Sequence, residues 1–224
     1  MRQRLFLLAL LAMSLASCDK SVTKAYWENG KLKSELRYAD GKLNGECRWY
    51  YESGTPMLSV NYVDDSKEGH SLRWHKNGQI QTDCWYKNDV LDSVSRSYSE
   101  KGILVEEKYY KEGILDGPFK KWHGNGQLFQ DGQYVDGMLD GSWLVFYPEG
   151  QLAAKAQYKM GQGKQTGYNE EGCIVYEATY LDNKKHGREI HYAPNGMVLQ
   201  VVEYEYGKIK TENEGAEEAD LSEK

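Results

Sequence analysis

An aromatic residue with a glycine four residues after it recurs along almost the whole chain, and no other feature of this 224-residue sequence constrains the fold as strongly. The aromatic residues are Tyr26, Tyr50, Trp74, Tyr98, Trp122, Phe146, Tyr168 and Tyr192. They are 24 residues apart except for one interval of 22. The glycines are Gly30, Gly54, Gly78, Gly102, Gly126, Gly150, Gly172 and Gly196. This regularity indicates eight structural units of one kind.

A tyrosine recurs with the same period, twelve residues after the first aromatic residue of each unit, which we number position zero. The tyrosines of position twelve are Tyr38, Tyr62, Tyr86, Tyr110, Tyr134, Tyr158, Tyr180 and Tyr204. Position fifteen is occupied by Gly41, Asp65, Asp89, Gly113, Gly137, Gly161, Asn183 and Gly207. Gly, Asp and Asn tolerate a left-handed backbone, so each unit has turn signals near positions four and fifteen that separate two short strands.

One such unit cannot bury its apolar side alone, so neighbouring units must stack. The chain contains 23 Gly and 18 Tyr, a composition typical of short strands joined by tight turns. The sequence therefore predicts an all-β fold, an elongated single antiparallel β-meander of about eight 24-residue hairpin repeats that forms an open, solenoid-like sheet. The glycines of position four and the tyrosines of position twelve are assigned to the structure of this repeat.

Side chains two residues apart in a strand share one face of the sheet. The even positions zero, six, ten and twelve are mostly apolar or aromatic, whereas the odd positions nine and eleven are mostly polar. We therefore expect an even face that packs the units together and a polar odd face. The aromatic residues could simply pack along their own sheet, with polar tips in water. Trp85, Tyr109 and Trp143 occupy odd positions, where self-packing explains them less well, and are predicted to bind a partner.

The segments Ala25–Glu35 and Tyr38–Glu46 show the full pattern, Tyr-x-x-x-Gly-x-Leu followed by Tyr-x-Asp-Gly-x-x-x-Gly. This pattern resembles the MORN-repeat variant family of bacteria, and the resemblance covers Tyr26 to Lys210. It implies an elongated antiparallel meander used for contacts with proteins or membranes, and some members of the family resemble antitoxins or immunity proteins. Three departures are Pro56, which should weaken a strand, and Ser93 in place of glycine together with the two-residue deletion, which should bend the sheet or mark a contact site.

The first 17 residues have two arginines, an apolar run and then small residues, as in a lipoprotein signal peptide. The stretch 15–18, Leu-Ala-Ser-Cys, resembles a bacterial lipobox and predicts lipidation of Cys18; an ordinary signal peptide cleaved nearby is the alternative. We expect a tether over residues 18–25, repeats over 26–210, and a disordered acidic tail over 211–224, which has six acidic residues and one lysine. The lipid would hold the protein to a membrane of the cell envelope, with the leaflet left open.

Signals for catalysis are weak. The histidines lack metal-ligand spacing, and Cys47, Cys84 and Cys173 fall at three different positions of the repeat, as expected for free thiols. The sequences 124–126 and 161–163 look like phosphate loops, but they lie at repeat turns without a following helical pattern. The net charge of −6 and the balance of basic and acidic residues do not suit nucleic acid. We therefore expect no catalytic residues, metal, cofactor or small-molecule substrate.

The sequence favours a non-catalytic, membrane-tethered repeat protein that serves as a protein-binding or scaffolding module in the bacterial envelope. The first alternative is an immunity protein or antitoxin that neutralises a toxin, which the acidic surface would suit. The second alternative is a glycan or cell-wall binder, because rows of aromatic rings also stack on sugars. The identity of the partner and the oligomeric state are not specified by the sequence.

Overall fold

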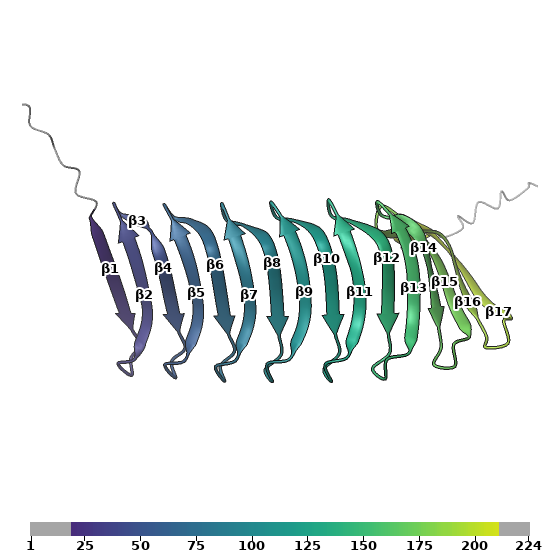
Figure 1. The fold of residues 1–224 in the computed structure, drawn as a ribbon, viewed down its shortest axis with the longest axis horizontal. Helices are drawn as coiled ribbons and strands as arrows, with labels where there is room; N and C mark the ends of the chain where they lie inside the picture. Colours follow the sequence, from purple (N-terminus) through teal and green to yellow (C-terminus); the bar gives the residue numbers. More distant parts are fainter. Residues whose placement is uncertain (1–18, 211–224) are drawn as a thin grey trace, which may run out of the picture.

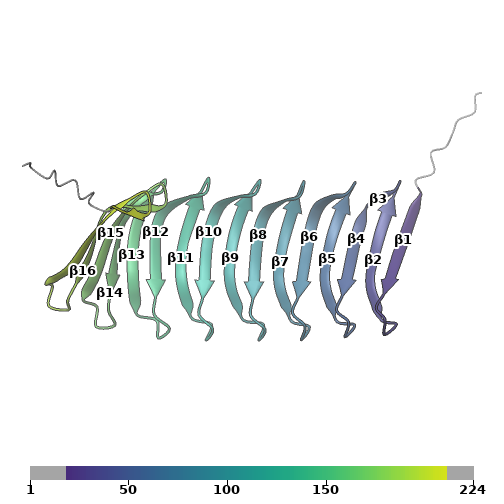
Figure 2. The ribbon, with the colours of Figure 1, turned by 180° about the vertical axis from the view of Figure 1, so that it is seen from behind.

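The computed structural model describes residues 19–210. The predictions for the signal peptide, for lipidation of Cys18 and for the acidic tail over 211–224 lie outside the described residues. Residues 19–210 form a single antiparallel sheet without a helix (Figures 1 and 2), which confirms the predicted all-β open meander. No candidate membrane-spanning helix occurs in this part of the chain.

The strands follow one another across the sheet in chain order, each paired with its neighbours in sequence. Their bounds are β1 Lys20–Tyr26, β2 Leu32–Ala39, β3 Lys42–Leu43, β4 Gly45–Tyr50, β5 Pro56–Val63, β6 Ser66–Trp74, β7 Ile80–Lys87, β8 Val90–Tyr98, β9 Leu104–Lys111, β10 Ile114–Trp122, β11 Leu128–Val135, β12 Met138–Phe146, β13 Leu152–Lys159, β14 Gln162–Tyr168, β15 Ile174–Leu181, β16 Lys184–Tyr192, β17 Val198–Glu205 and β18 Lys208–Ile209. The short strand β3 and the strand β4 both pair with β2 and together fill one place in the sheet.

The sheet begins earlier than the sequence indicated. Lys20–Tyr26 form β1, which pairs with β2 along its whole length, so a tether over residues 18–25 was the wrong assignment for most of that segment. The physical reason is that the aromatic residue of position zero ends a strand. Tyr26 is the last residue of β1, and the residues before it are the second strand of a preceding unit.

The two turns of each unit follow from left-handed residues. The glycines of position four have φ between 77° and 96°, and the residues of position fifteen have φ between 62° and 86°. Position fourteen is also left-handed, with φ of 48° at Asn88 and at Asp136, so the second turn is a two-residue turn of the type that suits twisted hairpins. Ser93, which replaces a glycine, has φ of 84°, and Pro56 is tolerated as the first residue of β5.

The assignment of faces from even and odd positions was wrong across these turns. A two-residue turn pairs residues of opposite parity, as in Val63 with Ser66 and Val60 with Ser71. Positions ten and twelve of the first strand therefore share a face with the odd positions of the second strand. We call this face the tyrosine face, because it has the tyrosines of position twelve. The opposite face, here called the Trp85 face, has positions nine and eleven, the even positions of the second strand and the aromatic residues of position zero.

Side chains in the turns connect successive units. At position one, His75 Nε2 lies 2.9 Å from the carbonyl oxygen of Tyr98, and His123 Nε2 lies 2.9 Å from that of Phe146. Near the opposite ends of the strands, Asp65 Oδ1 accepts a hydrogen bond of 2.7 Å from the backbone N–H of Leu43. Both histidines are half-buried in contacts between units, a role that the sequence analysis missed.

The sheet changes shape at the sixth unit. Other hairpins have a register shift, for example between Asp131 and Gln133, but β13 and β14 pair without interruption. The deletion thus removes the two residues that form the bulge elsewhere. Asn183 then reaches past the sixth unit to the fifth, where Oδ1 accepts a hydrogen bond of 2.8 Å from Leu139 N and Nδ2 donates one of 2.8 Å to Gly137 O. Strands β14–β17 turn away from the row formed by β1–β13, as Figures 1 and 2 show. We call β12–β17, which are the turned strands together with the last two strands of the row, the C-terminal bend.

Candidate functional site

Trp85 is a prominent exposed side chain near the middle of the sheet. It lies on β7 opposite His70 of β6, and the two rings stack with centroids 4.8 Å apart and an interplanar angle of 27°. His70 Nε2 is in turn 2.7 Å from Asp83 Oδ1. The indole is 45% exposed although one of its faces is covered. The stack leaves a rigid, partly exposed aromatic surface of the kind that protein interfaces use as an anchor.

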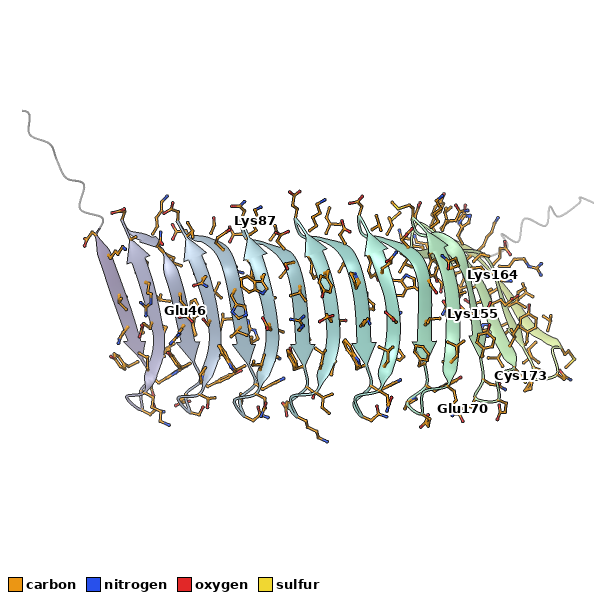
Figure 3. All side chains as sticks on the ribbon, viewed as in Figure 1. Glu46, Lys87, Lys155, Lys164, Glu170 and Cys173 are labelled. Atoms are coloured by element: carbon orange, nitrogen blue, oxygen red, sulfur yellow. The ribbon has the colours of Figure 1, made fainter. Side chains whose placement is uncertain are left out.

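Ion pairs occupy much of the Trp85 face on either side of this tryptophan. Arg96 Nε lies 2.6 Å from Glu107 Oε2, and Arg48 Nη2 lies 2.7 Å from Glu46 Oε2. The hydrogen bond from Arg48 lowers the pKa of Glu46. Figure 3 labels Glu46 and Lys164, two charged residues of this face that lie on β4 and β14. Exposed pairs of this kind contribute roughly 0–1 kcal/mol each, so the ion pairs set the charge pattern of the face more than its stability.

Tyr109 shares this face with Trp85. Both residues occupy position eleven, in the fourth and third units, and their strands β9 and β7 are separated only by β8, which places them roughly 10 Å apart. Tyr109 lies opposite Val94 and is half-buried, with its Cβ 3.0 Å from the place that a Cβ on Gly117 would take. The structure therefore brings these two predicted residues together on one face, while partner binding by them stays a prediction.

Trp143 was expected beside them on the polar face, and this placement was wrong. Trp143 lies on the tyrosine face, opposite Ala156, and is only 5% exposed. Its ring contacts Phe119, Tyr134 and Tyr158, with centroids 5.4, 5.1 and 6.4 Å away. Its position in the unit is odd, but it lies on a second strand. After the two-residue turn, the odd positions of that strand lie on the tyrosine face. Trp143 is thus part of the small core of the protein.

Glycine makes room for this tryptophan. A Cβ on Gly132 would lie 2.3 Å from the Trp143 ring, so any other residue at position 132 would displace the indole. The indole Nε1–H donates to the carbonyl oxygens of Gln133 and Asp140, at 3.1 and 3.2 Å. The packing and these hydrogen bonds hold Trp143 against the backbone, which agrees with a structural position.

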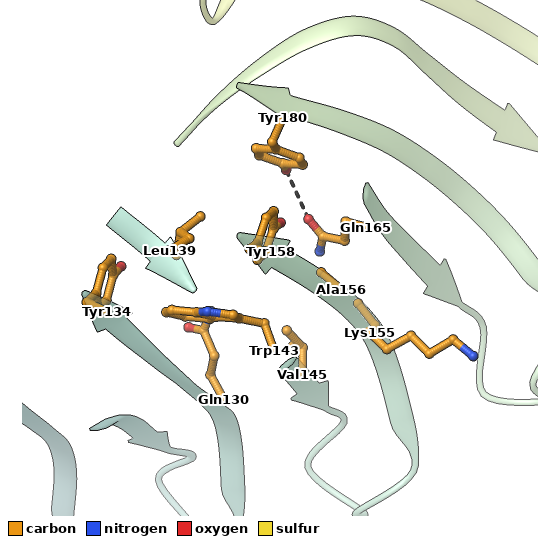
Figure 4. A pocket seen from close by; sticks show the side chains of 11 residues that line it. Gln130, Tyr134, Leu139, Trp143, Val145, Lys155, Ala156, Tyr158, Gln165 and Tyr180 are labelled. Carbon is orange, nitrogen blue, oxygen red and sulfur yellow. Dashed lines mark hydrogen bonds between the residues drawn. The ribbon is translucent and has the colours of Figure 1, made fainter. Parts of the chain in front are cut away.

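The tyrosine face is hollowed at the C-terminal bend (Figure 4). The hollow holds about 250 Å³ and is lined by Tyr134, Leu139, Trp143, Tyr158, Gln165 and Tyr180, among others. The Tyr180 hydroxyl donates a hydrogen bond of 2.9 Å to Gln165 Oε1, and Tyr158 and Tyr180 meet edge to face. Burial raises the pKa of both tyrosines above its usual value. The sequence signals for this hollow were the deletion and the small residues at position ten.

A second hollow, of about 340 Å³, lies near the other end of the sheet. It is lined by Glu46, Arg48, Trp49, Tyr50, Pro56, Leu58, Ser59, Leu72 and Trp74. Tyr50 and Trp74 are aromatic residues of position zero in consecutive units. The Ser59 hydroxyl donates a hydrogen bond of 2.7 Å to Glu46 Oε1, which leaves Arg48 and Glu46 as polar groups beside two rings.

Potential metal ligands and thiols outside these surfaces are not grouped into a site within the described residues. Within residues 19–210, no three His, Cys, Asp or Glu side chains are grouped so that they could hold a metal ion. Cys47, Cys84 and Cys173 are free thiols, and burial raises the pKa of Cys47 and Cys84. On the tyrosine face, Lys108 and Lys121 both contact the carboxylate of Glu106, which neutralises the charge of that group.

Five segments of the chain match the MORN repeat variant family, at residues 22–40, 43–64, 115–136, 139–160 and 185–206. The chain carries five repeats of this family. Each match extends from a second strand through the following first strand to the two-residue turn, so these MORN repeats start at a different point from the units numbered above. Trp85 and Tyr109 lie between the second and third matched segments. No curated protein matches the chain.

Two solved structures that match part of the chain are the crystal structure of TcdB2-TccC3, with a TM-score of 0.24, and the Photorhabdus luminescens Tc holotoxin pore, with a TM-score of 0.23. Each is 12% identical in sequence to this chain, and each match covers 78% of this chain but only 12% of the solved chain. A likeness of this size carries no functional argument.

Proposed function

We propose that this MORN-repeat chain is a non-catalytic module that binds another protein through the Trp85 face. The observation that carries the proposal is the stack of Trp85 on His70 in the middle of the sheet. The other large hydrophobic residues that are exposed within residues 19–210 lie at strand ends, in turns or at the two edges of the sheet. The exposure of the large Trp85 ring is therefore not explained by a place in a turn or at an edge of the sheet.

The surroundings of Trp85 suit a protein partner. Its ring is held by His70, which reduces the entropy that would be lost on binding, and Tyr109 supplies a second aromatic surface roughly 10 Å away. The ion pair between Arg96 and Glu107 lies close by and can contribute to specificity at the rim of an interface. An aromatic centre with a charged rim is the usual anatomy of such sites.

The proposal includes a tether to a membrane of the bacterial envelope through a lipid on Cys18. The lipobox-like stretch at 15–18 supports it, and β1 begins two residues after Cys18, which would keep the sheet close to the lipid surface. Metabolic labelling of the full chain with a fatty-acid probe should label the protein and not its Cys18→Ser variant. Equal labelling of the two would remove the tether from the proposal.

The binding surface is tested by a photo-reactive phenylalanine analogue placed at Trp85 in the full chain in cells. The same analogue at Tyr62, on the tyrosine face, is the control. We expect a discrete cross-linked protein from position 85 only. With that protein purified, Trp85→Ala should weaken binding by about 30-fold, because an aromatic anchor typically contributes roughly 2 kcal/mol or more. Equal affinities of Trp85→Ala and the original chain would contradict the proposal, and a captured toxin would favour the immunity alternative.

A second candidate function is glycan binding at the hollow between Tyr50 and Trp74. Aromatic rings stack on sugar rings, and Glu46 and Arg48 offer polar groups at the same place. Retention on isolated cell wall should then depend on Trp74 and not on Trp85. A Trp74→Ala variant that is retained as well as the original chain would dismiss this candidate.

A further inference from the structure

Within residues 19–210, the eighth unit at the C-terminal edge of the sheet has no full-length second strand. Strand β18 pairs only with the end of β17, at Tyr204 and Glu205. In complete units the partner strand runs the full length, so that in the second unit Leu58, Ser59 and Val60 face Arg73, Leu72 and Ser71. The equivalent residues of β17, Gln200, Val201 and Val202, have a partner strand only on the β16 side within the described part of the chain.

The backbone of β17 offers hydrogen bonds along this free edge. Lys210 N donates a bond of 2.8 Å to Glu203 O on the side away from β16. Successive residues of a strand point their N–H and C=O groups to alternate sides, so the backbone groups of Val201 and Leu199 also point away from β16. An unpaired edge of this kind is a template for another strand.

The same edge is unusually apolar for an exposed surface. Four consecutive or nearly consecutive residues are exposed: Met197, Val198, Leu199 and Val201, at 60%, 53%, 63% and 43%. Natural sheets usually protect such edges with lysine, proline or a covering segment. On the side of β17 away from β16, the only covering strand within residues 19–210 is the two-residue β18. The edge therefore has both the hydrogen-bonding groups and the apolar side chains of an interface.

The other end of the sheet has the complementary strand. Strand β1 is a second strand of a unit, and within the described residues it pairs with β2 alone. All seven of its residues are exposed. It has Lys20 and Lys24, whereas β17 has Glu203 and Glu205, so the two edge strands have opposite charges. In the part of the chain that the structure describes, one end of the sheet thus lacks the kind of strand that the other end presents.

We propose that β1 of a second copy of this chain completes the eighth unit by pairing antiparallel with β17. The register of the complete units puts Thr23, Lys24 and Ala25 of the second copy opposite Val202, Val201 and Gln200. Each added copy presents a new free β17 edge, so the contact is head-to-tail and builds an open chain of molecules. The two edges lie at opposite ends of the sheet (Figures 1 and 2), so one molecule cannot close on itself.

The register provides a direct test by disulfide trapping. Because Val201 points its backbone groups toward the incoming strand, Val202 and Thr23 of the second copy form a non-hydrogen-bonded pair, with Cα atoms roughly 4.5 Å apart, a distance that a disulfide can span. We would produce the full chain with Thr23→Cys and Val202→Cys together in cells and oxidise the whole cell lysate, with its membranes, with copper phenanthroline. Non-reducing gels should then show a ladder of dimers, trimers and longer species.

Matched variants separate this contact from others. The single substitutions keep the native cysteines and should stay monomeric. Adding Val201→Pro to the double variant removes an outward N–H without touching the bonds to β16, and should reduce the ladder at least tenfold, whereas Val201→Ala should keep it. A double variant that stays monomeric would overturn the proposal. The same monomeric result is expected if another segment or another protein covers β17. Dimers of Val202→Cys alone would overturn it in favour of a symmetric pairing of two β17 strands.

Discussion

The flat part of the sheet, β4–β11, and the C-terminal bend are built from the same repeat but are stabilised differently. In the flat part, both faces meet solvent, and the units are joined by backbone ladders, turn side chains and cross-strand pairs that contribute roughly 0.2–1 kcal/mol each. At the bend, Trp143, Ala156 and Tyr158 form a buried cluster with Phe119, which lies on β10 of the flat part. The same repeat thus gives an open sheet in one region and a small aromatic core beside the hairpin that has the two-residue deletion.

Replacing the central residue of the cluster should have the largest effect on this difference. Trp143→Ala leaves a cavity among Phe119, Tyr134 and Tyr158, and should lower the free energy of unfolding by about 3–5 kcal/mol. Trp85→Ala is the control, because its exposed ring lies on the flat part and its loss should cost no more than about 0.5 kcal/mol. Urea denaturation followed by circular dichroism measures both. Equal losses would mean that the bend has no special core.

Overpacking the same cluster should have the next largest effect. A methyl group on Gly132 meets the Trp143 ring, so Gly132→Ala should destabilise the protein by about 1–3 kcal/mol. Gly124→Ala is the matched control, because a Cβ there has nothing within 4 Å and no left-handed φ. Thermal denaturation of both variants checks this pair. Equal drops in melting temperature for Gly124→Ala and Gly132→Ala would show that the Trp143 ring does not restrict position 132.

The hydrogen bonds of Asn183, which connect the seventh unit to the fifth, should contribute less to stability than the aromatic cluster does. Asn183→Ala removes the hydrogen bonds to Leu139 N and Gly137 O and should cost about 1–2 kcal/mol. Asp89→Ala, in the flat part, removes the one equivalent hydrogen bond to Lys67 N and should cost less. Hydrogen exchange followed by mass spectrometry distinguishes the two, since Asn183→Ala should speed exchange in β12 and β16, and Asp89→Ala only near β6–β8. Uniform exchange changes in both variants would contradict the comparison.

The smallest effect is expected from acid on the ion pairs of the flat part. Arg48 holds the pKa of Glu46 below its usual 4.5, so the pair stabilises the folded state above pH 4.5 and loses this contribution as the pH falls through the folded pKa. Because the pair is exposed, the contribution should be at most about 1 kcal/mol. Denaturation at pH 7 and pH 3 should show the difference between Arg48→Gln and the original chain shrinking in acid. A difference independent of pH would exclude the pair as its cause.

The repeat made the course of the chain predictable. Gly126 and Gly137 mark turns in the structure as in the sequence, because a left-handed backbone restricts which residues can occupy those positions. Ser93 and the deletion before Tyr168 were both expected to bend the sheet or mark a contact site, and the sheet turns at the deletion and not at Ser93. Local backbone chemistry decides these features, so a single sequence contains them.

The faces were less predictable because they depend on how two strands meet. The two-residue turn places Val60 opposite Ser71, so counting even and odd positions through the turn assigned Trp143 to the wrong face. Trp85 and Tyr109 were placed on the correct face because both lie on first strands of their units. The polar residues of positions nine and eleven, which defined that face, lie on the same strands. The bonds from Asn183 to the fifth unit could not be foreseen, since they form only when the sheet bends.

Small-angle X-ray scattering of an insertion variant tests most directly whether the deletion causes the bend. An Asp-Gly pair inserted between Gly163 and Lys164 restores the 24-residue period and the missing bulge. The same pair inserted in the turn at Glu149–Gly150 is the control. We predict that the first insertion straightens the molecule, increases its maximum dimension and exposes Trp143 to quenching by acrylamide, while the control changes neither. An unchanged maximum dimension and a Trp143 still protected in the first variant would contradict the account.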